Sequence, residues 1–226
     1  MDELVNEAVI VHHELVGIVT AVSDLVFSRD KKVEIGLSLL RASADHAIAS
    51  ARLIEVTQAE LGASVVVLAR SQIDSFLRGV FFLQIATDEE VDYFIENDEM
   101  PSRKMPNGNM GRLGPKTLAS MVEAELGITE NGKLFPMVDN TWKSFSGFTH
   151  GGMHMVQTYS EADEIGSNIA ADNLTNLLRN MSVLVTFSAC AMVNACGLNV
   201  EEQQEVLQKL AAISKCRAER VLEGKA

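Results

Sequence analysis

The sequence predicts an all-α fold, a single-domain bundle of several helices over residues 1–226. Apolar residues recur every three or four positions along most of the chain, as on the buried face of a helix. No long stretch alternates apolar and polar residues as a half-buried strand would. A chain of 226 residues is also long enough to bury a substantial core. The expected helices cover residues 2–28, 33–58, 62–86, 88–97, 117–126, 137–150, 172–197 and 200–222.

Residues 62–86 are expected to form the central and most buried helix of the bundle. At about 100° per residue, the apolar side chains spread around the whole circumference of this helix and leave no side for water. Gly79 lies within it, and a glycine at such a position suggests that a second backbone approaches closely.

Three charged residues of this helix, Arg70, Asp74 and Arg78, lie four apart and share one side of it. Charges inside a core are tolerated only when they are paired and hydrogen-bonded, and Asp74 can pair with either arginine. Two interpretations remain open. The three residues form a structural clamp, or the arginines await a phosphate or carboxylate in an anion-binding or catalytic site.

Residues 98–116 contain three of the four prolines of the chain together with three glycines, and we expect a flexible basic loop rich in proline and glycine. Between Pro101 and Thr117 there are four bases and no acid. The segment is either a solvated loop or a mobile flap over an anionic site. In the second case Arg103 and Lys104 would bind the ligand.

Composition favours a cytoplasmic protein with no membrane segment. The net charge of −12 argues against a general nucleic-acid coat protein. Three cysteines without a CxxC motif are typical of reduced thiols, and the N-terminus is acidic where a signal peptide would be basic. Residues 180–200 carry no charge, but their many small and polar side chains favour a buried core helix over a membrane span. No metal or cofactor is expected.

The second informative stretch, residues 142–155, reads WKSFSGFTHGGMHM. Its glycine pair ends a helix and places His150 in the last turn, where the helix dipole favours a protonated imidazole suited to general acid catalysis. A simple capping histidine is the alternative interpretation. The side chains and backbone expected to contact a ligand around His150 belong to Trp142, Lys143, Thr149, Gly151 and Gly152.

The segment ARSQIDSFLRG at 69–79, followed by ATDEEVDYF at 86–94 and THGG at 149–152, resembles a bacterial family of helical proteins of unknown function, over roughly residues 36–196. In general character that family is similar to the HEPN-type helical bundles, which include toxin and phage-defence proteins of the abortive-infection kind. This looser resemblance implies a metal-independent ribonuclease, an RNA or other phosphate-containing partner, and a possible homodimer.

Two hypotheses from different classes follow. In the first, the protein is a metal-independent ribonuclease or nucleotide-processing enzyme in which His150 is the general acid or base, Arg70 and Arg78 stabilise phosphate charge, and Asp74 orients the arginines. In the second, it is a non-catalytic helical sensor that binds a small anionic ligand or a protein partner.

One Arg-x4-His match also occurs, at Arg41 and His46. Five residues on a continuous helix separate the two side chains by about 140°, so Arg41 is expected on the solvated side and His46 on the buried one. Whether the two residues form a functional pair or a chance match stays open.

Overall fold

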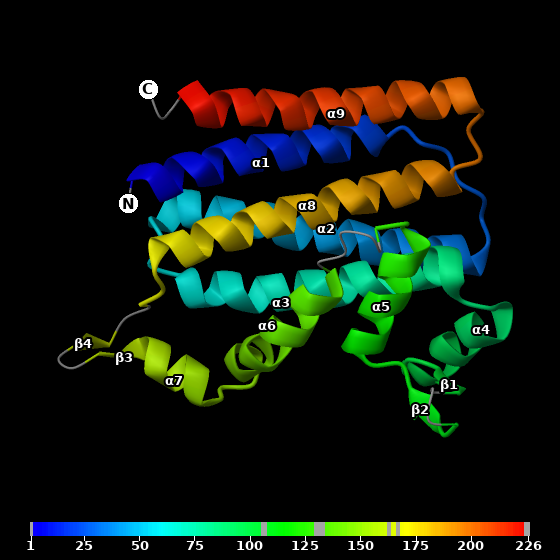
Figure 1. Ribbon diagram of the computed structural model, residues 1–226, viewed down its shortest axis with the longest axis horizontal. Helices are drawn as coiled ribbons and strands as arrows, with labels where there is room; N and C mark the ends of the chain where they lie inside the picture. Colours follow the sequence, from blue (N-terminus) through cyan, green and yellow to red (C-terminus); the bar gives the residue numbers. More distant parts are fainter. Residues whose placement is uncertain (1, 105–107, 129–133, 162–163, 166–167, 224–226) are drawn as a thin grey trace.

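The computed structural model describes residues 2–104, 108–128, 134–161, 164–165 and 168–223, and confirms the predicted all-α bundle. Five long helices lie roughly side by side (Figure 1). These are α1 (Asp2–Val22), α2 (Lys31–Thr57), α3 (Gly62–Val80), α8 (Ala171–Ala195) and α9 (Val200–Glu223).

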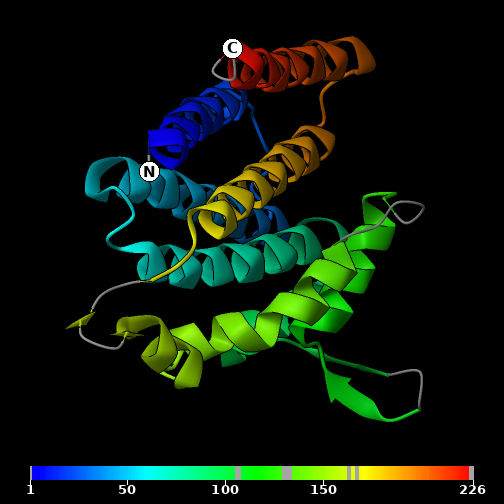
Figure 2. The same ribbon diagram turned by 60° about the vertical axis from the view of Figure 1, so that its left-hand side comes forward.

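The segment between α3 and α8 packs on the side of α3 that faces away from α1 and α9 (Figure 2). It holds the helices α4 (Asp88–Asn97), α5 (Pro115–Glu125), α6 (Leu134–Thr149) and α7 (Met153–Tyr159). It also holds two small hairpins, β1 (Ser102–Lys104) with β2 (Met110–Arg112), and β3 (Ser160–Glu161) with β4 (Glu164–Ile165). The sequence patterns did not indicate α7 or either hairpin.

Helix α3 is shared between the two clusters of the core. Val65 and Ala69 of its first half pack with α1, α2 and α8, whereas Phe76 and Leu77 of its second half pack with α5 and α6. Eleven of its nineteen residues are buried. The predicted central helix is therefore confirmed.

The contact between α2 and α3 depends on two glycines. A Cβ atom at Gly79 would lie 2.8 Å from the side chain of Leu40 and 3.0 Å from its backbone nitrogen. A Cβ atom at Gly36 would lie 2.7 Å from Cβ of Leu83 and 2.9 Å from its backbone nitrogen. The close approach expected at Gly79 is confirmed, and Gly36 is its counterpart on α2.

The sequence predicted one regular helix over residues 62–86, but the α-helix ends at Val80. Residues Phe81–Ile85 form a single turn of π-helix, η1, which Ala86 closes by donating its N–H to the carbonyl oxygen of Phe81 at 2.8 Å. The wider turn leaves the consecutive residues Phe81, Phe82 and Leu83 all buried. An α-helical turn would spread three consecutive side chains over about 200°.

The segment 98–116 is more ordered in its backbone pairing than its prolines and glycines suggested. Strands β1 and β2 pair antiparallel, with Arg103 opposite Gly111. Leu113 extends the pairing by donating its N–H to the carbonyl oxygen of Pro101 at 3.0 Å. Residues 105–107 lie outside the described part of the chain.

Within the described residues, two helices are long and apolar enough to cross a membrane by length and composition alone, α1 and α8. Half of the most apolar window of α8 is buried against other helices. A core helix passes the same test, and α8 packs in the core with α1, α2 and α3, as expected for residues 180–200.

We predict that Gly36→Ala destabilises the protein by about 1–3 kcal/mol, since the added methyl group would overlap the Leu83 backbone. This loss opposes the gain of about 1 kcal/mol that alanine brings to a helix interior. Urea unfolding followed by circular dichroism measures the change.

Gly17→Ala in α1 is the matched control. Its added Cβ would meet only the side chain of Ile213, at an ordinary 3.5 Å, so this variant should be as stable as the wild type or more stable. Equal effects of the two substitutions would contradict the close approach of α2 and α3.

Candidate functional site

Asp74 and Arg78 form a two-pronged ion pair on α3. The Arg78 Nη2 and Asp74 Oδ2 atoms lie 3.1 Å apart, and Arg78 Nε donates to Asp74 Oδ1 at 3.2 Å. The side chain of Arg78 is 34% exposed and that of Asp74 is 24% exposed. The expected pairing is therefore present, but the expectation that these charges lie inside a closed core is wrong, because the neighbouring elements leave this side of α3 partly open to water.

Arg70 has different partners. Its guanidinium carbon lies 4.2 Å from the centre of the Trp142 ring, and its Nε donates to Ser146 Oγ at a long 3.4 Å. In the described part of the chain, no acid forms an ion pair with Arg70. The three charges are thus an Asp74–Arg78 pair beside a separate arginine, and not one clamp.

Helix α6 carries both partners of Arg70. Trp142 and Ser146 are four residues apart and so lie on one side of α6. The first turns of α6 are held in place by Leu134 and Val138, which are buried in the same cluster as the apolar residues of α5. Ser146 was not among the predicted residues, although its spacing from Trp142 could have identified it.

His150 directly follows α6 and is exposed. The backbone N–H of His150 donates to the carbonyl oxygen of Ser146 at 3.0 Å, so His150 continues the helical hydrogen bonding by one residue. Across the residues that the structure describes, no hydrogen bond or ion pair joins His150 to Arg70 or Arg78. The structure thus places His150 at the exposed end of α6, without a direct bond to either arginine in the described part of the chain.

The two glycines after His150 have roles in the chain itself. Gly151 has φ +66°, the left-handed conformation with which many helices end. Gly152 donates its N–H to the carbonyl oxygen of Gly147 at 2.7 Å, and a Cβ at Gly152 would come within 3.2 Å of that residue. Helix termination and close packing account for both glycines without a ligand.

The two remaining residues of α6 that were expected to contact a ligand, Thr149 and Lys143, are both exposed. Thr149 is exposed and donates its hydroxyl to the carbonyl oxygen of Phe145 at 3.0 Å. Lys143 is exposed next to Trp142. Of these two residues, only Lys143 brings an available charge near Arg70.

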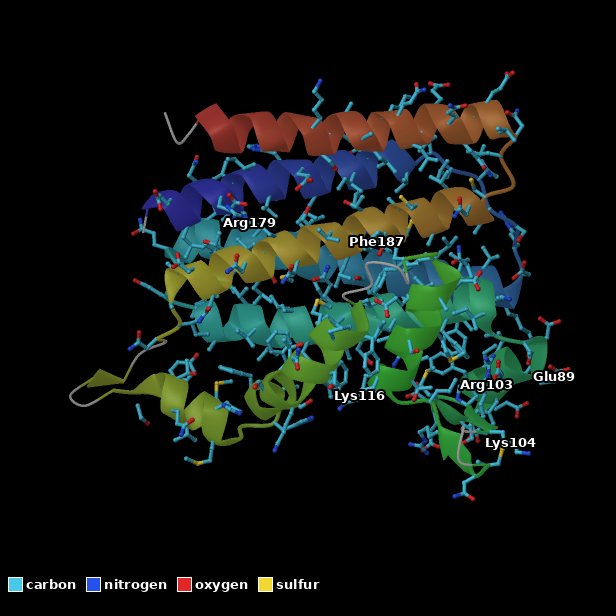
Figure 3. The ribbon with its side chains drawn as sticks, in the orientation of Figure 1. Glu89, Arg103, Lys104, Lys116, Arg179 and Phe187 are labelled. Atoms are coloured by element: carbon cyan, nitrogen blue, oxygen red, sulfur yellow. The ribbon has the colours of Figure 1, made fainter. Side chains whose placement is uncertain are left out.

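Arg103, which was expected to bind a ligand, connects the β1–β2 hairpin to α4 and to the end of η1. Its guanidinium donates two hydrogen bonds to the carboxylate of Glu90, at 2.5 and 2.6 Å, and one to the carbonyl oxygen of Ile85 at 3.3 Å. It also lies over the ring of Phe81, 5.2 Å from the centre. Figure 3 shows Arg103 where the β1–β2 hairpin meets α4. Lys104, on the same strand, is exposed.

Two further bases of this segment also have acidic partners. Arg112 pairs with Glu99, and Lys116 pairs with Asp139 of α6. The absence of acids within residues 101–117 suggested a basic flap, but acids from α4, α6 and Glu99 pair with three of its four bases in the folded chain. Arg103 therefore has a structural role in this fold.

The two residues of the Arg-x4-His match lie on different sides of α2, as helix geometry predicts. Arg41 is exposed and donates from Nε to Asp45 Oδ1 at 2.9 Å. His46 is partly buried, and burial lowers the pKa of its imidazole. No contact between the two side chains is present among the described residues.

No group of three histidine, cysteine, aspartate or glutamate side chains that could hold a metal ion occurs in the described part of the chain. Cys190 and Cys196 are free thiols. The candidate site is therefore the Arg70–Trp142–Ser146 cluster, with the Asp74–Arg78 pair beside it.

Comparison with known proteins gives a family but no activity. The model of one family, described as a family of unknown function (DUF6988), matches residues 40–218. No curated protein and no solved structure matches the chain. A family of unknown function is thus found over most of the chain, as expected, but nothing in these comparisons supports the motif expected for it or the resemblance to HEPN-type bundles.

We predict that Arg103→Met destabilises the protein by about 1.5–3 kcal/mol at pH 7, because Glu90 would lose its charged hydrogen-bond donor while largely buried. Arg112→Met is the control. Its ion pair with Glu99 is exposed, so its loss should cost less than about 1 kcal/mol. Urea unfolding of the three proteins measures both changes.

The Arg103 effect should also depend on pH. Burial acts to raise the pKa of Glu90, but the hydrogen bonds from Arg103 and from the Thr87 N–H outweigh burial and hold the pKa below its ordinary value. A lowered carboxyl pKa stabilises the fold above the ordinary value near 4.5, and this contribution disappears as the pH falls through the folded-state pKa. A difference between wild type and Arg103→Met that stays constant down to pH 3 would contradict this.

Proposed function

Because the chain belongs to this family of unknown function, its activity has to be inferred from its own residues, and we propose a non-catalytic helical module that binds a small anionic ligand at Arg70. The observation that carries the proposal is the state of the Arg70 guanidinium. It is partly buried over Trp142 and has no acidic partner among the described residues.

The donors of Arg70 are largely unused. A guanidinium group has five N–H donors, and within the described residues its one hydrogen bond is the long one from Nε to Ser146. The ring of Trp142 holds the cation through a cation–π contact but accepts no strong hydrogen bond. The fork of remaining donors matches the oxygens of a phosphate or carboxylate.

Arg78 is a weaker candidate for the same anion. Both prongs of its guanidinium are bound to Asp74, and the two arginines are eight residues apart, or about 12 Å along the helix. Further positive charge comes from Lys143, which is exposed and directly follows Trp142 on α6. We therefore assign the anion to Arg70, with α6 forming the other side of the site.

Among the described residues no direct bond joins His150 to the arginines, and this supports binding rather than cleavage. General acid catalysis requires the acid within hydrogen-bonding reach of the group that it protonates, while the phosphate is held by the arginines. Nothing in the described residues brings His150 and Arg70 into contact.

The first test is titration calorimetry with inorganic phosphate and with a nucleoside monophosphate. Arg70→Gln should weaken binding at least about tenfold, since hydrogen bonds to a charged group contribute roughly 1.5–3 kcal/mol. Asp74→Asn should tighten binding, because it removes a nearby negative charge and releases Arg78. Arg41→Gln, which changes an exposed arginine that already pairs with Asp45, should leave affinity unchanged.

Two results would overturn the anion site. One is wild-type protein that binds neither probe at millimolar concentration. The other is Arg70→Gln protein that binds as well as the wild type does.

The second test separates binding from catalysis. Wild-type protein incubated with a mixed RNA panel in the presence of a chelator should leave the RNA intact. Cleavage that disappears in a folded His150→Ala variant would overturn the non-catalytic assignment and favour the ribonuclease hypothesis instead.

A further inference from the structure

A cavity of about 440 Å³ lies between α3, α6 and α8, and none of the sequence patterns indicated it. Its apolar walls include Val66 and Ile73 of α3, Phe145 and Phe148 of α6, and Leu177 and Met181 of α8. This volume falls within the range of about 300–1,000 Å³ that is typical of small-molecule pockets.

A fully buried polar side chain, Gln72, also lines the cavity. Its amide Nε2 donates to the backbone carbonyl oxygen of Met181 at 2.8 Å. Because the partner is a carbonyl oxygen, the NH₂ group must face it, and this fixes the orientation of the amide. The other end of the amide, Oε1, has no hydrogen-bond partner.

An unpaired buried carbonyl oxygen costs free energy, since it has lost its water without gaining a donor. The described residues that line the cavity offer it none. A donor carried by a bound molecule would satisfy it.

The rest of the lining indicates the charge of such a molecule. None of the lining residues in the described part of the chain is charged. The polar ones include Asn173, Asn176 and Asn180, which are exposed on α8, and Thr141 and Ser144 of α6. Transfer of an ionised group into such a site would be costly without an opposite charge, so the lining favours a neutral molecule.

We propose that this cavity binds a neutral small molecule with an apolar body and a hydroxyl or N–H donor that reaches Gln72 Oε1. The apolar body contacts the phenylalanines of α6 and the aliphatic side chains of α3 and α8. Outer polar groups of the molecule reach the asparagines of α8.

This site is separate from the anion site. Arg70, Trp142 and Ser146 do not line the cavity, whereas their neighbours Ala69, Thr141 and Phe145 do. The two sites thus depend on different side chains, and phosphate binding can fail while this proposal holds.

The test uses 4-propylphenol and propylbenzene, which differ by one hydroxyl group, in titration calorimetry with the full chain. A purely apolar cavity prefers propylbenzene, because the phenol must lose its hydration. The proposed site reverses the order, and 4-propylphenol should bind about tenfold more tightly to the wild type. Gln72→Met keeps a side chain of similar length without the acceptor, and should restore the preference for propylbenzene.

A second pair of variants keeps the test valid if Gln72→Met does not fold. Asn176→Trp places a large side chain on the polar edge of the cavity and should weaken binding of both compounds. Val183→Trp, at an exposed position of α8 that does not line the cavity, should leave binding unchanged.

Three outcomes would overturn the proposal. The first is wild-type protein that binds neither compound. The second is wild-type protein that prefers propylbenzene, and the third is an Asn176→Trp variant that binds 4-propylphenol as tightly as Val183→Trp does. A preference for propylbenzene would mean that ordered water already satisfies Gln72 Oε1.

Discussion

The backbone contact between α2 and α3 is the constraint on which the rest of the structure depends. Gly36 and Gly79 let the two helices approach until only hydrogen atoms fit where side chains would stand. The position of α3 is thereby fixed against α2 and the helices that pack with α2. Its side chains can then serve both clusters of the core, and Gln72 can reach the backbone of α8. Packing of this kind has little tolerance, because a displaced helix would disturb contacts on every side.

Helix α6 is the element that both candidate sites share. One side presents Trp142 and Ser146 to Arg70, and another presents Thr141 and Phe145 to the cavity beside α8. Adjacent residues of a helix point about 100° apart, so a single helix lying on α3 forms a wall for each site. Leu134 and Val138 near the N-terminal end of α6 are buried and Thr149 at its C-terminal end is exposed, so α6 is fixed at one end and reaches solvent at the other.

Helix periodicity is a local signal, and for that reason the sequence predicted most of the helices, the close approach at Gly79 and the pairing of Asp74 with one of its two neighbouring arginines. The π turn at 81–85 could not be predicted, because the apolar pattern of these residues is equally compatible with a continuing α-helix. The neutralisation of Arg103 by Glu90 depends on tertiary structure in the same way. Spacing within one segment says nothing about acids that lie elsewhere in the chain.

The difference between Arg70 and Arg78 does follow from local chemistry. Asp74 is four residues from each, but an acid placed N-terminal to a base at this spacing pairs better than the reverse order, since it also suits the helix dipole. Asp74 therefore pairs with Arg78, as the structure has it, and no carboxylate of the described residues pairs with Arg70. What the local rule cannot supply is Trp142, which comes from α6 and holds the cation by its aromatic face without using its hydrogen-bond donors. An arginine fixed in place by an aromatic ring, with its donors unspent, has already lost much of its side-chain entropy. It can therefore bind an anion at a lower cost than a free surface arginine can.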